Sequence, residues 1–301
     1  MTQGQRIDSG DRRRCAVLGS PIAHSLSPLL HRAAYRQLGL DWEYTAVEMS
    51  AEALPEFVAG LSAQWRGLSL TRPLKRAVID LCDRVESRGR LLGSINTVIF
   101  DEGRRSGHNT DVPGLVRALA ANGIRELDSA VIVGAGATAA SAMAAAAEVG
   151  AHRVTVSARS VERAASLLAL AEPLHLTVQL VGFDALGALP PADLVVSTIP
   201  AAAQCSMAGL LVTLGACVFD VVYDPPLTPM LLAARDAGTQ AIGGFDLLLH
   251  QAARQVELMV GVSSAPLEAM REAGLQALAQ PPAATSATLS DVDQTGNIVD
   301  C

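Results

Sequence analysis

The chain has 301 residues and a formal net charge of −7, and half of its residues are hydrophobic although only 3% are aromatic. This length allows two domains with buried cores, and the alanine-, leucine- and valine-rich composition favours helices on parallel sheets over an all-β sandwich. The negative charge argues against binding nucleic acid or an anionic membrane. Five scattered cysteines and six histidines without ligand spacing argue against a disulfide framework or a metal site, and they fit a reducing cytoplasm.

The first hundred residues alternate strands and helices. Residues 1–13 are expected to be a disordered tail and not a signal peptide, because no apolar stretch follows their basic residues. Strands are predicted at 15–20, 41–48, 67–70 and 94–100, with helices at 28–38, between the second and third strands, and from Pro73 onward. This β-α-β-α-β pattern predicts one α/β domain over residues 14–112.

The second half repeats the alternation. After a helix that begins at Pro113, strands are predicted at 130–133, 152–158, 176–181, 193–199 and 216–222. Alanine-rich helices separate them, which predicts a Rossmann-like, doubly wound parallel sheet over residues 113–246. Residues 247–278 are expected to form helices that pack back on the first domain, and the polar tail 279–301 to be disordered.

An uncharged stretch from residue 129 to 147 is nearly long enough to span a membrane. Its first part is β-branched, Gly134 and Gly136 follow, and the rest consists of small helix-forming residues. A strand, a turn and a buried helix explain this order better than a membrane span. Glycines at such a turn let the backbone approach a pyrophosphate, and the helix N-terminus supplies N–H donors, so the stretch predicts a dinucleotide site.

The end of the next strand selects the cofactor. Where NAD-binding proteins carry an acid for the ribose hydroxyl, this chain has Arg159, followed by Ser160 and, one helical turn on, Arg163. A guanidinium can bind a phosphate with two hydrogen bonds, so the pattern favours the 2′-phosphate of NADP. The alternative is an arginine that is merely solvated at the end of a strand.

Three further stretches hold candidate ligands. Ser27 precedes Pro28 and is predicted to cap a helix, while Ser25 has no such explanation, and paired hydroxyls beside a helix N-terminus can hold a carboxylate. Asp111 could be only a helix cap, but it lies where the chain passes between the domains, and clefts between domains are preferred ligand sites. Lys75 is either a solvated cation or a proton donor and acceptor whose partner lies elsewhere.

Eight motifs in order resemble the shikimate dehydrogenase family, especially its branch in high-GC Gram-positive bacteria. The resemblance covers residues 15 to 262 and rests on these motifs: GSPIAHSLSP, GLSLTRPLK, GSINT, GHNTDVPG, GAGATAA, ARS, DVVYDPPLTPMLLAA and LLLHQA. No single motif is decisive, but eight in the correct order make chance improbable.

The resemblance implies a reaction and a set of site residues. NADPH would reduce 3-dehydroshikimate reversibly to shikimate, on the route to chorismate and the aromatic amino acids, with Lys75 and Asp111 as the catalytic pair. The implied substrate ligands are Ser25, Ser27, Thr71, Asn96, Asp111, Tyr223 and Gln251. The implied NADP contacts are Gly134, Ala135, Gly136, Ala137, Thr138, Ala158, Arg159, Ser160, Arg163, Val221 and Gly244.

Four departures from the family and several alternatives remain at this point: GAGA replaces the more usual GAGG, Asp246 replaces a frequent glycine, and the other two concern Ser69 and Arg72. Ser69 stands where asparagine is more usual, and Arg72 stands where a small or apolar residue is usual. A quinate/shikimate dehydrogenase, an amino-analogue dehydrogenase using NAD or NADP, and a non-catalytic NADP-binding paralogue share most motifs, and a tetrahydrofolate dehydrogenase is more remote. The expected partners are small molecules only, and the chain is expected to be a cytoplasmic monomer or homodimer.

Overall fold

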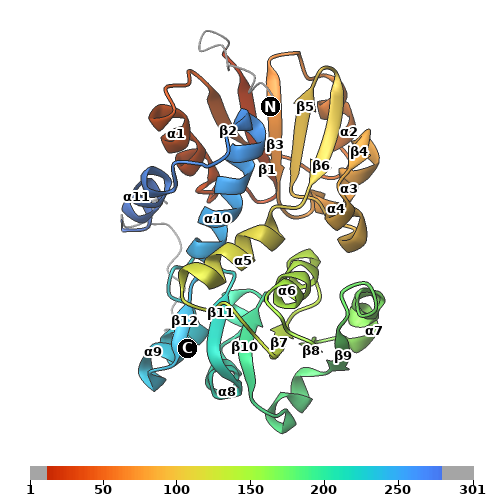
Figure 1. Ribbon diagram of the computed structural model, residues 1–301, viewed down its shortest axis with the longest axis vertical. Coiled ribbons are helices and arrows are strands. Elements are labelled where there is room, and N and C mark those ends of the chain that lie inside the picture. Colours follow the sequence, from red (N-terminus) through yellow and green to blue (C-terminus); the bar gives the residue numbers. More distant parts are fainter. Residues whose placement is uncertain (1–11, 280–301) are drawn as a thin grey trace, which may run out of the picture.

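The computed structural model describes residues 12–279. The tails expected to be disordered, 1–13 and 279–301, lie outside the described residues except for residues 12, 13 and 279. The described chain forms two α/β units, one above the other in Figure 1, each built on its own six-stranded sheet. The two-domain α/β fold expected from the sequence is therefore confirmed.

The first unit holds a mixed sheet in the order β2-β1-β3-β5-β6-β4. Its strands are β1 (Arg14–Gly19), β2 (Glu43–Glu48), β3 (Trp65–Leu70), β4 (Arg84–Val85), β5 (Thr97–Asp101) and β6 (Arg104–His108). The first three strands are parallel, and β5 runs antiparallel to both β3 and β6. Its helices are α1 (Ser27–Gln37), α2 (Leu54–Ala59), α3 (Leu74–Ala77) and α4 (Ser87–Leu92).

The second unit holds a fully parallel sheet in the order β12-β11-β10-β7-β8-β9. Its strands are β7 (Ser129–Val133), β8 (Arg153–Ser157), β9 (Thr177–Val181), β10 (Ala192–Ser197), β11 (Gly215–Asp220) and β12 (Gln240–Ile242). Counted from β7, this is the order 3-2-1-4-5-6 of a dinucleotide-binding fold, so the ligand crevice is expected where β7 and β10 meet. Its helices are α6 (Ala137–Glu148), α7 (Val161–Ala164), α8 (Ala208–Leu214) and α9 (Pro229–Ala237).

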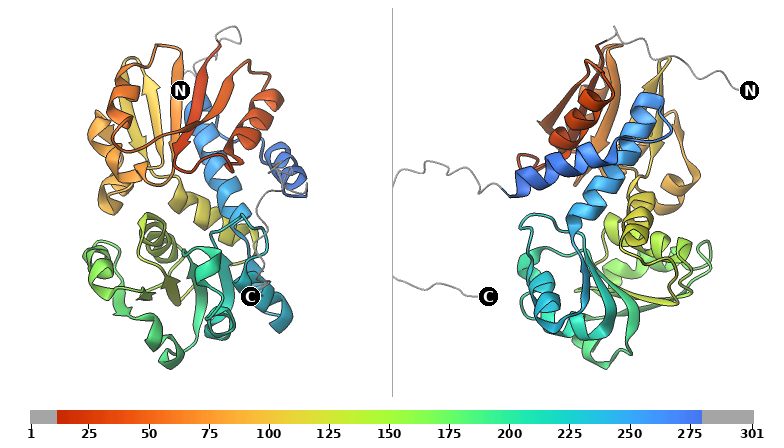
Figure 2. Two further views of the ribbon diagram at one scale, coloured as in Figure 1. Left: turned by 180° about the vertical axis from the view of Figure 1, so that it is seen from behind. Right: turned by 60° about the vertical axis from the view of Figure 1, so that its left-hand side comes forward.

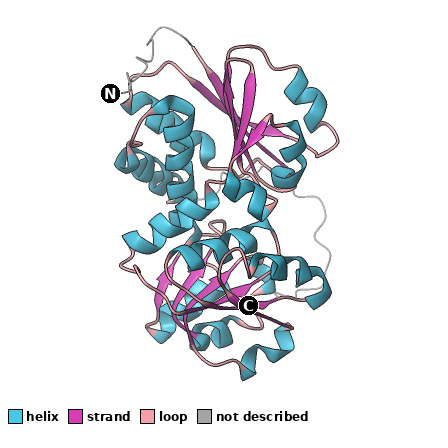
Figure 3. Ribbon diagram, turned by 45° about the vertical axis from the view of Figure 1, so that its right-hand side comes forward, coloured by secondary structure: helices cyan, strands magenta, loops and turns pink. Residues whose placement is uncertain are grey.

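Helices cover both faces of the second sheet, as Figure 3 shows. Along β7, Ala130 and Ile132 pack into the core under α5 (Asp111–Ala121) and α6, while Val131 and Val133 pack into the core under α8 and α9. Burial on both faces explains why the strands read as continuous apolar runs in the sequence. The uncharged stretch at 129–147 is thus β7, a turn and α6, as its composition predicted.

Two helices join the units. α5 follows the first sheet, and α10 (Gly244–Val256) leaves the second sheet after β12 and runs back along the first (Figures 1 and 2). α10 packs with α1 and α11 (Leu267–Leu278) on one face of the first sheet, in a core that includes Leu30, Leu249 and Met270. A Cβ at Gly114 of α5 would lie 2.8 Å from Gln251 Cβ of α10, so glycine sets how closely these two helices approach.

The sequence reading differs from the structure in local detail. α5 begins at Asp111 and not at Pro113, so the expected boundary at 112/113 falls inside a helix. The sequence predicts one long apolar helix after residue 244. In the structure its first part is α10, which ends at Val256, and its last part is a single π-helical turn, Glu257–Gly261. The short strand β12 was missed, because three residues give no readable alternation.

Candidate active site

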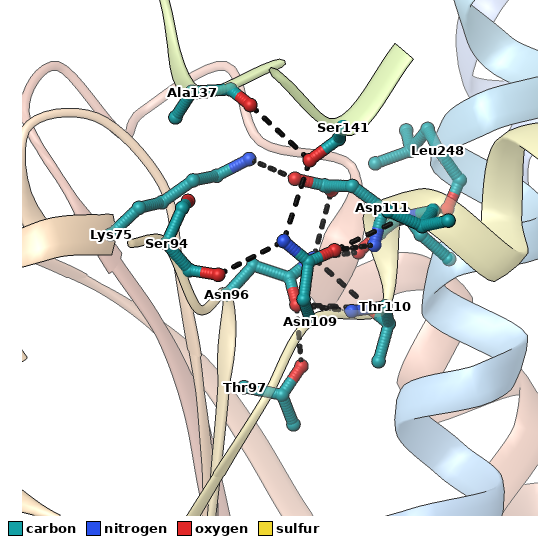
Figure 4. Close-up of polar contacts among 12 residues, drawn as sticks. Lys75, Ser94, Asn96, Thr97, Asn109, Thr110, Asp111, Ala137, Ser141 and Leu248 are labelled. Atoms are coloured by element: carbon teal, nitrogen blue, oxygen red, sulfur yellow. Dashed lines mark hydrogen bonds and ion pairs between the residues drawn. The ribbon is translucent and has the colours of Figure 1, made fainter. Parts of the chain in front are cut away.

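Lys75 and Asp111 form a close ion pair at the junction of the two units. Lys75 Nζ lies 2.5 Å from Asp111 Oδ2, and the two side chains are only 16% and 7% exposed. Figure 4 shows them pointing toward each other close to Ala137 and Ser141 of α6. A solvated lysine would show neither the burial nor the partner, so that alternative is wrong.

The carboxylate of Asp111 does not cap its own helix. The Asn109 side-chain oxygen accepts from the backbone N–H groups of Asp111 and Val112, at 3.1 and 3.2 Å, and so takes the capping role. Asn109 also donates to the Ser94 carbonyl at 3.0 Å. The carboxylate of Asp111 is therefore free to contact other side chains, and it faces Lys75 and Asn96.

Asn96 fixes the other oxygen of that carboxylate. Its Nδ2 donates to Asp111 Oδ1 at 2.8 Å and lies 3.4 Å from Gln251 Oε1, while its Oδ1 accepts from the Thr110 backbone N–H at 2.8 Å. Because an amide oxygen cannot donate, the Thr110 bond determines which end of Asn96 faces the carboxylate. Three predicted ligands, Asn96, Asp111 and Gln251, are thereby brought together.

The serine pair lies at the start of α1, but the capping prediction for Ser27 is wrong. Ser27 is the first helical residue, and its neighbour Leu26 occupies the cap position without a capping side chain. Ser25 Oγ instead accepts from the Ser27 N–H at 3.3 Å. The chain turns into the helix one residue earlier than the Ser-Pro pattern suggested, which leaves the Ser27 hydroxyl without a capping role.

Two acids, the exposed Glu48 and the buried Asp220, hold the loops around the serines. Glu48 accepts from Ser20 Oγ at 2.5 Å and from the Ile22 N–H at 3.1 Å, which fixes the loop before Ser25. Asp220, at the end of β11, accepts from the Val222 N–H at 3.0 Å and leads into the loop that carries Tyr223. Burial raises the pKa of Tyr223, so its hydroxyl stays a neutral donor beside Ser25.

One cavity of about 230 Å³ joins these groups. All predicted catalytic and substrate-binding residues line it: Ser25, Ser27, Thr71, Lys75, Asn96, Asp111, Tyr223 and Gln251. Thr138, Val221 and Gly244 from the predicted cofactor set line it too, so the cavity opens toward the glycine turn of the second unit. Arg72, by contrast, is exposed and does not line the cavity.

The glycine turn lies at the switch point of the parallel sheet. Gly134 has φ +119°, and a Cβ there would lie 2.2 Å from Thr198 Oγ1, at the end of β10. Gly136 caps α6 in an extended conformation and faces open space. The turn from Gly134 through Ala135, Gly136 and Ala137 to Thr138 therefore leaves free backbone at a helix N-terminus, which is the cradle a pyrophosphate requires.

The candidate phosphate ligands lie farther from the cavity, after β8. Arg159 and Arg163 are exposed, and Ala158 is buried. Ser160 caps α7 by accepting from the Arg163 N–H at 3.3 Å, and it donates to Glu162 at 2.9 Å. None of these residues lines the cavity, as expected for groups that would hold the far end of a dinucleotide.

Val221 lies in the loop after β11, and Gly244 is the first residue of α10. A Cβ at Gly244 would lie 2.5 Å from the carbonyl oxygens of Val221 and Val222, so only glycine fits there. This contact brings the start of α10 against the loop that carries Tyr223. Ser69 and Gln255 also line the cavity, but the sequence reading assigned neither of them a site role.

Among residues 12–279, no cluster of histidine, cysteine, aspartate or glutamate could hold a metal ion. Over the same residues, no helix is both long and apolar enough to cross a membrane. The candidate site therefore consists of the cavity, the ion pair and the glycine turn.

Comparison with family models finds two matches. Residues 17–98 match the shikimate dehydrogenase substrate binding domain, and residues 244–273 match the shikimate 5′-dehydrogenase C-terminal domain. A shikimate dehydrogenase (NADP+) from Synechococcus is 36% identical over 285 residues, which cover 90% of this chain and 96% of the relative. The corresponding protein of Citrifermentans bemidjiense is 38% identical over 282 residues, 89% and 96% of the two chains.

Solved structures give the same result. Shikimate dehydrogenase from Mycobacterium tuberculosis is similar with a TM-score of 0.81 and 39% identity, covering 88% of this chain and 99% of that one. The enzyme from Thermus thermophilus, solved in complex with NADP(H) and shikimate, has a TM-score of 0.76 and 33% identity, with coverage of 88% and 99%.

Proposed function

The chain belongs to the shikimate dehydrogenase family, and from this membership we propose that it reduces 3-dehydroshikimate reversibly to shikimate with NADPH through Lys75 and Asp111. It is an NADP-dependent oxidoreductase of the shikimate pathway. The observation that supports the residue roles best is the buried pair of Lys75 and Asp111 on the wall of a cavity that opens toward the glycine turn.

Two groups of side chains that line this cavity hold the substrate. Ser25 and Ser27 present hydroxyls, with the Tyr223 hydroxyl nearby, to bind the substrate carboxylate. Thr71, Asn96 and Gln251 bind the ring hydroxyls. This arrangement directs the ring carbon that reacts toward the ion pair. Among the described residues that line the cavity, Lys75 is the only lysine or arginine.

The proton comes from the ion pair. Reduction of the ketone adds a hydride to its carbon and a proton to its oxygen. The Lys75 ammonium hydrogen-bonds to the carbonyl oxygen, stabilises the negative charge that develops on it and transfers the proton. Asp111, held by Asn96, keeps the Lys75 amine directed into the cavity, and the neutral amine regains a proton from water.

The second unit fits the cofactor. Gly134 and Gly136 leave room for a pyrophosphate at the N-terminus of α6, and Thr138 of this turn lines the substrate cavity. When bound, NADPH supplies the hydride. Ala135 and Ala137 complete the turn, and Ala158, Arg159, Ser160 and Arg163 form the site of the 2′-phosphate, with Val221 and Gly244 at the nicotinamide end.

The domain roles follow from these sites. Residues 14–112 form the substrate domain and residues 113–246 the NADP domain, with α5 crossing the boundary between them. Residues 247–278 return to the substrate domain, which agrees with the packing of α10 and α11 on the first sheet. The enzyme acts in the cytoplasm on small molecules, as a monomer or a homodimer.

One assay tests the function. Purified protein is mixed with shikimate or quinate, each with NADP+ or NAD+, and the absorbance of the reduced nicotinamide is followed. Fast turnover of shikimate with NADP+ supports the proposal. Preference for quinate or NAD+ indicates a quinate/shikimate dehydrogenase, and binding of NADPH without turnover of either acid indicates a non-catalytic paralogue.

A further inference from the structure

A series of buried hydrogen bonds runs from β2 to the catalytic carboxylate. We call Tyr44, Ser69, Gln255, Thr97 and Asn96 the Tyr44 network. Tyr44 Oη donates to Ser69 Oγ at 2.6 Å, and Ser69 Oγ donates to Gln255 Oε1 at 2.9 Å. Gln255 Nε2 donates to Thr97 Oγ1 at 3.0 Å, and Thr97 Oγ1 donates to Asn96 Oδ1 at 3.0 Å.

Each bond of the Tyr44 network points the same way. Gln255 Oε1 can only accept and its Nε2 can only donate, so the amide has one orientation that satisfies both neighbours. Rotating the Gln255 amide by about 180° would place Oε1 against the Asn96 carbonyl oxygen. In the structure that oxygen accepts a hydrogen bond from Nε2 at 3.2 Å. The network ends at Asn96 Nδ2, which donates to Asp111.

Tyr44 can serve as the fixed starting point. Its side chain is fully buried, and burial raises its pKa, so the phenol stays protonated and donates. His31 of α1 stacks on the ring with centroids 3.9 Å apart, and its Nδ1 lies 2.9 Å from the Ser27 carbonyl. The ring is therefore held between the helix that begins at the serine pair and the strand that carries Ser69.

We propose that Tyr44, which does not line the cavity, is a positioning residue for this reaction. It acts through Ser69 and Gln255, which do line the cavity, and through Thr97 on the amide of Asn96 that orients Asp111. The inference rests on the proposed function, because the geometry it maintains is that of the Lys75–Asp111 pair. A satisfied network in a low-dielectric interior is worth more than its separate bonds, so losing its first donor weakens the rest.

The test is a double-mutant cycle on shikimate oxidation with NADP+. Tyr44→Phe removes only the first donor, and Gln255→Met removes the central amide at similar volume. Each is expected to lower kcat/KM for shikimate about tenfold while KM for NADP+ stays unchanged. Because both act through one network, the double variant is expected to be no slower than Gln255→Met alone.

Tyr35→Phe is the matched control. Tyr35 is equally buried and belongs to the same aromatic cluster, but its hydroxyl faces Met259 sulfur at 3.9 Å and takes no part in the network. This variant should retain wild-type kinetics. At Thr97, serine should preserve kcat/KM and valine should lower it, which keeps the test decisive if Gln255→Met folds poorly.

The outcomes separate the claims. Two results would overturn the positioning role: an unchanged kcat/KM in Tyr44→Phe, or a double variant whose loss of kcat/KM is the product of the two single losses. The network would then be structural and affect only the melting temperature. An unsubstituted protein that does not oxidise shikimate would instead refute the proposed function.

Discussion

Asp111 uses its two carboxylate oxygens for two different partners. Oδ2 contacts Lys75 and Oδ1 accepts from Asn96, while the capping of α5 is left to Asn109. Asp111→Asn should therefore keep the helix and the fold, but leave Lys75 without its counter-charge. We expect kcat to fall by roughly 10²–10⁴. Steady-state kinetics with shikimate and NADP+ measure this fall.

Asp101→Asn is the control for that substitution. Asp101 lies at the end of β5, is 70% exposed and pairs with Arg66 at the surface. Its variant should turn over shikimate like the unsubstituted protein. If Asp111→Asn lost only thermal stability and retained turnover, the carboxylate would have a structural role alone.

Arg159 is the residue on which cofactor choice is expected to depend. Arg159 is exposed and lies just after β8, so its guanidinium can bind a 2′-phosphate. It would not first have to break a hydrogen bond or ion pair with another described residue. Arg159→Ala should raise KM for NADP+ and leave KM for NAD+ nearly unchanged, so the preference for NADP+ is lost. Arg153→Ala, at the exposed opposite end of β8, should leave both constants unaltered. An unchanged preference in Arg159→Ala would assign Arg159 to the surface.

His31 makes stability depend on pH. Burial lowers its pKa to about 4, although the bond with the Ser27 carbonyl opposes this shift. Because the folded pKa is below the unfolded value, the unfolded chain takes up this proton first, and stability is lost as pH falls from about 6.5 toward 4. At about pH 5 the loss is on the order of 2 kcal/mol.

The measurement is urea unfolding near pH 7.5 and near pH 5. His31→Gln cannot take up this proton, so it should lose less stability between the two pH values than the unsubstituted protein. Carboxylates titrate in both proteins, and their effect cancels in the comparison. Equal losses would mean that His31 is not buried in its neutral form.

At the scale of elements, the contact of α5 with α10 positions Gln251 beside Asn96 and Asp111. A methyl group on Gly114 would lie 2.8 to 3.0 Å from Gln251 atoms, backbone included, so α10 would have to move. Gly114→Ala should cost about 1–3 kcal/mol and raise KM for shikimate. Thermal unfolding and steady-state kinetics report the two effects.

Gly209 provides a control within α8. A Cβ there meets nothing within 4 Å, so Gly209→Ala should keep KM and be neutral or slightly stabilising. If both variants behaved alike, the close approach of α5 and α10 would not be what positions Gln251.

Over the whole molecule, most strands and the glycine turn could be predicted because they depend on local patterns. Apolar runs indicated the parallel strands. Gly134 indicated a turn in which a Cβ atom would clash with Thr198. The capping of α1 was predicted wrongly, since a Ser-Pro pair fits either of two adjacent helix starts. The Tyr44 network could not be predicted, because Ser69 and Gln255 meet 186 residues apart and only the packing of α10 on the first sheet joins them.

The arrangement of the two units matters most at Lys75, because elements of both units meet there. The most direct measurement is kcat for shikimate oxidation by Lys75→Ala beside Arg76→Ala, which removes the neighbouring exposed cation. We expect Lys75→Ala to reduce kcat by roughly 10²–10⁴ with KM for NADP+ unchanged, and Arg76→Ala to have no effect. A Lys75→Ala protein that turns over shikimate at the unsubstituted rate would contradict the assignment of Lys75 as the proton donor.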